Sequence, residues 1–164
     1  MGAESQRPAA GATERLDLPV LRRQVEIPYG AEYSLELRRA NVTGTSLQAL
    51  NLSAPIVPLQ PPDCKCDDKP APFTHDEGAY ASDAFFPSLP IAITGEYIQR
   101  GHRILTVEIW PVAYNPITGG LLFYSQVDVR INLKGSDAPF TQAQADRFAS
   151  PAFEARMARQ VLNF

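Results

Sequence analysis

Alternation of apolar and polar residues is the clearest pattern in the chain, and it is strongest between Arg103 and Leu133. In the second half of this stretch one parity is apolar and the other mostly polar. The apolar set is Leu121, Phe123, Val127, Val129, Ile131 and Leu133. Successive side chains of a strand point to opposite faces of a sheet. The pattern therefore predicts a long strand with one face in the core and the other mostly in water.

The first half of this stretch shows the same alternation and predicts the other arm of a β-hairpin. If Tyr114 pairs with Leu121 across the turn, a regular antiparallel register places the apolar Ile109 opposite the polar Gln126. A slip of one residue reverses every side chain of a strand. One extra residue at Trp110-Pro111 removes the conflict, and Pro111 has no N–H to donate to a ladder. We therefore predict a β-bulge within the hairpin at this dipeptide.

Shorter alternating or β-branched runs predict further strands along the chain. They cover residues 18–27, 33–40, 46–52 and 91–99, with a turn at 41–44. Fifteen prolines and ten glycines separate these runs, and the proline-rich stretch 54–62 fits an edge or an extended connector. The expected fold is mainly β: an antiparallel β-sandwich or barrel-like domain with short C-terminal helices.

Helical signals are confined to the end of the chain. Thr141 is expected to cap one short helix, and Ser150-Pro151 is typical of a second helix start. Phe153, Met157 and Val161 form one apolar face, which could dock on this domain or on a partner. The expected organisation is a disordered segment 1–17, a β core 18–140 and a helical segment 141–164.

Composition and charge narrow the classes of function. Fifteen Lys and Arg against eighteen Asp and Glu give a net charge of −3, which offers nucleic acid no basic surface. No apolar run approaches the ~20 residues of a membrane span. The N-terminal residues also lack the apolar region of a secretory signal, so the protein is either cytosolic or has lost its signal.

Candidate chemical groups are few. The residues considered are Cys64, Cys66, His75, His102 and the acidic Asp63, Asp67, Asp68, Asp76 and Glu77. The two cysteines are compatible with surface thiols, a local redox pair or a metal site. A Cys-His catalytic pair is disfavoured because neither cysteine lies at a strand-to-helix junction, and His102 is expected on the surface. The acidic residues could bind a divalent cation loosely, but they lack a recognised spacing. We expect no enzyme activity, cofactor or bound metal.

Several ordered motifs resemble the N-terminal propeptide of gingipain-like (family C25) cysteine peptidases, which are caspase-like proteases secreted by Bacteroidetes and relatives. They are Leu18-Pro19, Ile27-Pro28, APIVPLQPP, Phe85-Phe86-Pro87, Arg100-Gly101 with Arg103, PVAYNPITG followed by Leu122, Tyr124 and Val127, and SPAFEARMARQVLNF. The resemblance covers about residues 18–164. The chain departs from the family in having Gln99 where Tyr often precedes Arg-Gly, and Cys64-Lys65-Cys66 is not a family feature.

The resemblance implies a secreted or cell-surface β-sandwich prodomain that assists folding of a C-terminal cysteine peptidase domain and blocks its active site. In gingipains a basic prodomain side chain enters the specificity pocket, which makes Lys65 and Lys69 candidate inhibitory residues. Two alternatives stay open. One is a secreted adhesion or carbohydrate-binding module using Trp110, Tyr114 and Tyr124, and the other is a metal- or redox-sensing domain using Cys64 and Cys66.

Overall fold

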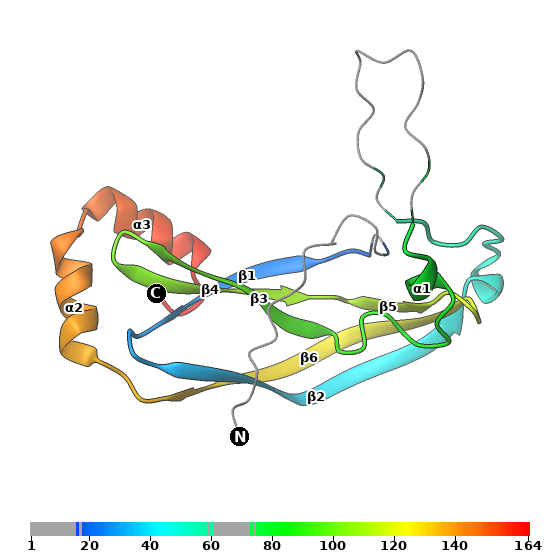
Figure 1. Ribbon diagram of the computed structural model, residues 1–164, viewed down its shortest axis with the longest axis horizontal. Coiled ribbons are helices and arrows are strands. Elements are labelled where there is room, and N and C mark those ends of the chain that lie inside the picture. The colour runs from blue at the N-terminus through cyan, green and yellow to red at the C-terminus, as the bar shows by residue number, and fades with distance from the viewer. Residues whose placement is uncertain (1–15, 17, 59, 61–72, 74) are drawn as a thin grey trace, which may run out of the picture.

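The computed structural model describes residues 16, 18–58, 60, 73 and 75–164, and its strands form two antiparallel sheets (Figure 1). One sheet has the strand order β1-β4-β3 and the other β2-β6-β5. The strands are β1 (Leu21–Ile27), β2 (Glu32–Ser46), β3 (Ile91–Gln99), β4 (His102–Ile109), β5 (Val112–Asn115) and β6 (Gly120–Lys134). The expected mainly β, antiparallel fold with short C-terminal helices is confirmed.

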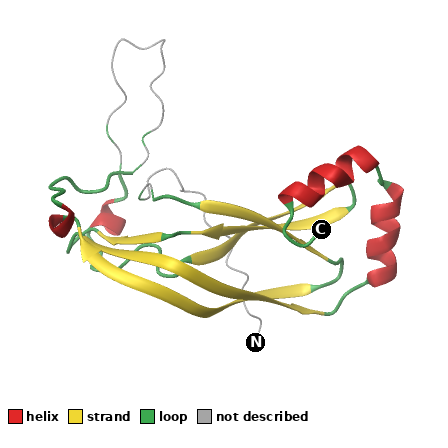
Figure 2. Ribbon diagram, turned by 180° about the vertical axis from the view of Figure 1, so that it is seen from behind, coloured by secondary structure: helices red, strands yellow, loops and turns green. Residues whose placement is uncertain are grey.

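The two sheets face each other through apolar side chains. Val25, Ile91, Val107 and Ile109 of the first sheet line the same internal space as Leu35, Val129 and Ile131 of the second. Along β4, Leu105 and Val107 are buried, as expected for an inward-facing apolar stripe. Figure 2 shows the two layers from behind, with the two C-terminal helices at one end and two short helical segments at the other.

The hairpin predicted between Arg103 and Leu133 is only partly correct. Tyr114 does pair with Leu121, but through the short strand β5, whereas β4 pairs with β1 and β3 in the other sheet. The predicted bulge at Trp110-Pro111 is therefore wrong, because the chain crosses between sheets at this dipeptide. The Trp110 N–H donates to Pro90 O at 2.8 Å in the first sheet, and Pro111 O accepts from Tyr124 N–H at 2.8 Å in the second.

The predicted turn at 41–44 is also wrong, since these residues continue β2. Asn41 pairs with Gln126 and Val42 with Tyr124, so Ser125 is an extra residue on β6. This irregularity changes the phase of the alternation. Phe123, expected in the core, is 39% exposed. The predicted strand 46–52 contains instead a short 3-10 helix, η1 (Gln48–Leu50).

The C-terminal helices are α2 (Ala138–Arg147) and α3 (Pro151–Gln160). Asp137, rather than the predicted Thr141, caps α2 by accepting from Phe140 N–H at 3.0 Å. Ser150 precedes Pro151 at the start of α3, as predicted. Met157 and Val161 are buried against Ile104 of β4, so this apolar face docks on the same domain. No helix in the described residues is long and apolar enough to cross a membrane.

Candidate functional site: the end of the sheets opposite the C-terminal helices

Residues 54–58 of the proline-rich connector run along the end of the molecule opposite α2 and α3, where the short helix α1 (Glu77–Tyr80) also lies (Figure 1). Pro58 is buried and forms an isolated bridge with Leu16. The chain is described again at Phe73 and from His75 onward. The segment that carries the candidate inhibitory lysines therefore starts and ends beside this surface.

Both flanks of that segment are fixed to the domain through Tyr80. The Tyr80 hydroxyl donates to Ile56 O at 2.9 Å, which ties α1 to the connector. Burial raises the pKa of Tyr80, so the hydroxyl stays protonated as a donor. The His75 ring stands edge-on to the Tyr80 ring and also contacts Phe73, with centroids 5.5 Å and 5.7 Å apart. Asp76 caps α1 by accepting from Ala79 N–H at 3.0 Å.

A compact apolar cluster lies beneath this end. Its buried members are Leu16, Leu18, Leu47, Tyr114 and Leu121, with Ile56, Tyr80, Phe86, Trp110 and Val112 packed against them. Tyr114 also exchanges two backbone hydrogen bonds with Phe86, each 2.9 Å long. Phe86 thus returns the chain after α1 to the core. Of the contact residues of the adhesion alternative, Tyr114 is a buried member of this cluster and Trp110 is partly buried against it.

The turn between β5 and β6 is held by the buried Asn115. Its side-chain oxygen accepts from the N–H groups of Ile117 and Thr118, and its amide donates to Asp83 at 2.8 Å. Gly119 has φ +65°, a conformation that suits glycine. The sequence YNPITGG therefore builds a rigid turn, which forms one wall of an adjacent pocket.

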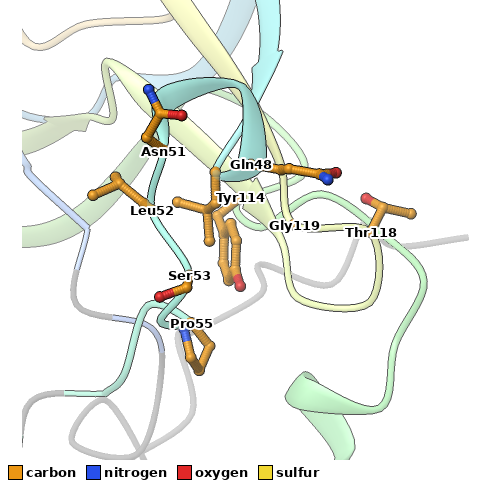
Figure 3. Close-up of a pocket in the computed structure, with 9 residues that line it drawn as sticks. Gln48, Asn51, Leu52, Ser53, Pro55, Tyr114, Thr118 and Gly119 are labelled. Atoms are coloured by element: carbon orange, nitrogen blue, oxygen red, sulfur yellow. The ribbon is translucent and has the colours of Figure 1, made fainter.

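The pocket opens beside η1 and has a volume of about 570 Å³ (Figure 3). Its lining residues are Leu47, Gln48, Asn51, Leu52, Ser53, Pro55, Tyr114, Thr118 and Gly119. Figure 3 shows the Tyr114 hydroxyl pointing toward the side where Ser53 and Pro55 lie. None of these nine residues is charged. The arrangement can hold a neutral group through apolar contact and amide or hydroxyl hydrogen bonds.

Sequence reasoning missed this pocket because it treated 46–52 as a strand. Two signals for a local turn were present. The Ser46 hydroxyl oxygen accepts from Ala49 N–H at 3.1 Å, and Asn51 adopts the left-handed conformation with φ 58°. Ser and Asn both favour such local backbone turns.

The structure describes only some of the candidate functional residues that the sequence predicted. Lys65, Lys69, Cys64, Cys66, Asp63, Asp67 and Asp68 lie outside them, as does segment 1–17 apart from the buried Leu16. Among the described residues, no three His, Cys, Asp or Glu side chains gather in a way that could hold a metal ion. Of the predicted acidic set, Asp76 serves as the cap of α1 and Glu77 is its first residue.

The expectation that His102 is a surface residue is wrong. His102 is 7% exposed, and its Nδ1 lies 2.7 Å from Glu26 Oε1. The rings of Phe153 and Phe164 lie against it, with centroids 6.0 Å and 5.1 Å away. The start of β4 buries this side chain under the C-terminal segment. Because His75 lies at the opposite end, the two histidines do not share a site.

Comparison with known proteins agrees with this architecture. The chain is 27% identical to Lys-gingipain from Porphyromonas gingivalis over 139 residues, and the match covers 84% of the chain and 8% of the relative. Lys-gingipain HG66 and Lys-gingipain W83 match to the same extent. The chain therefore spans a small fraction of the length of these curated relatives.

Two solved structures share the fold. One is the complex of P. gingivalis RgpB pro- and mature domains, with a TM-score of 0.67, 18% identity, and coverage of 93% of this chain and 74% of that one. The other concerns the zymogenic latency of gingipain K from P. gingivalis, with a TM-score of 0.60, 25% identity, and coverage of 77% and 70%. The model of the C25 propeptide family (Propeptide_C25) matches residues 11–153. The chain belongs to the propeptide family of gingipain-like C25 cysteine peptidases.

Proposed function

We propose that this chain is the non-catalytic prodomain of a secreted or cell-surface cysteine peptidase, which it helps to fold and keeps inactive. The observation that carries the proposal is the match to the C25 propeptide family over residues 11–153. The peptidase domain would be C-terminal to the chain. Two features support a role in binding: the end near α1 presents a neutral pocket, and the flanks of segment 59–74 are tied to the core beside it.

The blocking element we propose is segment 59–74, with Lys65 or Lys69 entering the specificity pocket of the peptidase. A lysine ammonium can form charge-assisted hydrogen bonds with acidic groups. The fixed flanks reduce the entropy that the segment loses on binding.

Inhibition in trans tests the main proposal. The purified chain is added to the mature peptidase from the same precursor, and residual activity on a peptide substrate is measured. We expect an inhibition constant below micromolar, and refolding of denatured peptidase should yield more active enzyme when the chain is present. Full activity at a hundredfold excess of chain over peptidase would contradict the inhibitory role.

The lysines are tested by Lys65→Ala and Lys69→Ala. Replacing the residue that enters the pocket should raise the inhibition constant at least tenfold, equivalent to about 1.4 kcal/mol. Arg156→Ala is a matched control, since this cation lies on α3 at the opposite end. If both lysine variants inhibit as well as the wild type, neither lysine is the blocking residue.

A further inference from the structure

We propose that the pocket beside η1 is a second contact with the mature peptidase, and that it receives a neutral extended segment of that domain through its backbone amides and an apolar side chain. This inference rests on the proposed function. It adds a docking site that is separate from segment 59–74 and acts before or alongside the blocking residue.

The polar groups of the pocket suit a peptide backbone. Tyr114 is 1% exposed, and its ring lies in the core while its hydroxyl points into the pocket. In the part of the chain that the structure describes, no hydrogen bond joins this hydroxyl to another group. The side-chain amides of Gln48 and Asn51 are exposed and have no protein partner there. A peptide supplies both N–H and C=O groups, which can bond these amides and the Tyr114 hydroxyl in place of water.

The charge of the pocket restricts its occupant to a neutral group. All nine lining residues are uncharged, so a charged side chain would lose its hydration without gaining a counter-charge. A charged group, whether a basic side chain or a carboxylate of the specificity pocket, is therefore not expected to bind in this pocket. The pocket is chemically distinct from the contact proposed for Lys65 or Lys69.

Apolar side chains at and beside the pocket are exposed. Leu52 lines it and is 54% exposed, and Leu50 and Ile117, which adjoin lining residues in the sequence, are 46% and 56% exposed. Exposed apolar side chains close to a pocket are typical of interaction sites. A partner seated on η1 and the 115–120 turn would remove part of this area from water.

The position of the pocket points to the peptidase as the occupant. Pro55 lines the pocket and Pro58 is anchored by the bridge to Leu16. Lys65 is seven positions after Pro58 and Lys69 is four positions before Phe73, so an extended chain keeps them within about 25 Å and about 14 Å of these residues. A peptidase whose active site receives either lysine would therefore lie near this end of the domain.

The experiment compares two pocket variants with one control in the inhibition assay. Leu52→Asp places a charge at the rim of a neutral pocket, and Tyr114→Phe removes only the hydroxyl. Leu162→Asp is the control, because Leu162 is 67% exposed and lies in the C-terminal segment at the opposite end. We expect the inhibition constant to rise at least tenfold for Leu52→Asp and about threefold for Tyr114→Phe, and to stay unchanged for Leu162→Asp. Unchanged thermal unfolding of Leu52→Asp verifies that its fold is intact.

A second measurement separates docking from inhibition. The peptidase is first inactivated with a small covalent inhibitor, and binding of each chain variant is measured by calorimetry. We expect the wild-type chain still to bind and Leu52→Asp to bind at least tenfold more weakly. Wild-type inhibition with no effect of Leu52→Asp in either assay would overturn the docking site and leave the proposed function intact.

Absence of inhibition by the wild-type chain, with binding that Leu52→Asp weakens, would overturn the inhibitory function and keep the docking site. Self-association of the free chain that Leu52→Asp abolishes would assign the pocket to a second copy, and would overturn the peptidase as its occupant.

Discussion

The side-chain amide of Asn163 pairs with the backbone of Glu26 in β1. Asn163 Nδ2 donates to Glu26 O at 2.9 Å, and Glu26 N–H donates to Asn163 Oδ1 at 2.8 Å. Leu162 N–H also donates to Gln24 O at 2.9 Å. The side-chain amide of Asn163 thus forms the same pair of hydrogen bonds with β1 that the backbone of a neighbouring strand would form. The C-terminal residues extend the first sheet beyond β1 and cover part of its free edge.

Asn163→Ala is expected to lower the free energy of unfolding by about 1 kcal/mol. It removes two hydrogen bonds, each with a net worth of about 0.5–1.5 kcal/mol, and the lower end applies because both bonds are exposed. Urea denaturation measures the change. Gln142→Ala is the matched control, because it removes a single exposed side-chain bond to Asp146. Equal stability of the two variants would show that the Asn163 pair contributes no more than one exposed side-chain bond.

The same contact predicts local protection from hydrogen exchange. In the wild-type chain the Glu26 and Leu162 amides should exchange more slowly than neighbouring solvent-facing amides, because both N–H groups are bonded. Asn163→Ala should raise the exchange rate of the Glu26 amide more than that of the Leu162 amide. Exchange measured by NMR provides the test, and unchanged protection of Glu26 would contradict the pairing.

Met157 is expected to be the main anchor of α3. Its side chain is fully buried against Ile104 of β4, and truncation of such a residue leaves a cavity. Met157→Ala should therefore cost about 2–5 kcal/mol of stability, measured by urea or thermal unfolding. Arg156→Ala, at the neighbouring exposed position of the same helix, should change stability by less than about 0.5 kcal/mol. Similar losses in both variants would contradict the docking of α3 through Met157.

Local patterns predicted much of this fold because they depend on nearest neighbours. The alternating run 91–99 coincides with β3, and the turn sequence correctly paired Tyr114 with Leu121. The apolar spacing of Met157 and Val161 identified the face of α3 that packs on the sheet. In each case the spacing of apolar residues along the chain is enough to decide which side chains face the core.

The sheet membership of β4 could not be predicted in the same way. Alternation shows which side chains of a strand face the core. It does not show whether two such strands are neighbours in one sheet or lie in two sheets that pack face to face. β4 and β6 were expected as the two arms of one hairpin, yet Val107 of β4 and Val129 of β6 meet from opposite sheets. The pocket was missed for a related reason, because the leucines of 47–52 fit a strand and a 3-10 turn equally well.

Gly101 is expected to be intolerant of substitution. Its φ is +82°, and an added Cβ would lie 2.3 Å from Gln144 O, a backbone atom of α2. Gly119 is a matched control, because its φ is +65° but its nearest neighbour would be 4.0 Å away. Both alanine variants lose about 1 kcal/mol to the left-handed backbone. Gly101→Ala must in addition displace α2, so its thermal unfolding midpoint should fall well below that of Gly119→Ala. Equal midpoints would contradict the close packing of α2.

Glu96 connects the two sheets at the β2 and β3 side. Arg103 Nε donates to Glu96 Oε1 at 2.6 Å, and the Tyr33 hydroxyl of β2 donates to Glu96 Oε2 at 3.1 Å. These bonds, with Arg103 contributing most, hold the pKa of Glu96 below its ordinary value of 4.5 although partial burial opposes them. The Glu96 bonds therefore stabilise the folded state only while the carboxylate is ionised.

The sign of the pH dependence follows from that lowered pKa. Stabilisation by Glu96 is complete above pH 4.5, the ordinary value that applies to the unfolded chain, and is lost as the pH falls through the lower folded value. Glu96→Gln, which cannot ionise, should lose less stability than the wild type between about pH 6 and about pH 3. Urea unfolding across this range measures both slopes. Glu32→Gln is the control, because the exposed Glu32 side chain forms no ion pair within the described residues. It should retain the wild-type slope, and a wild-type slope in Glu96→Gln would show that the Arg103 and Tyr33 contacts do not couple Glu96 ionisation to folding.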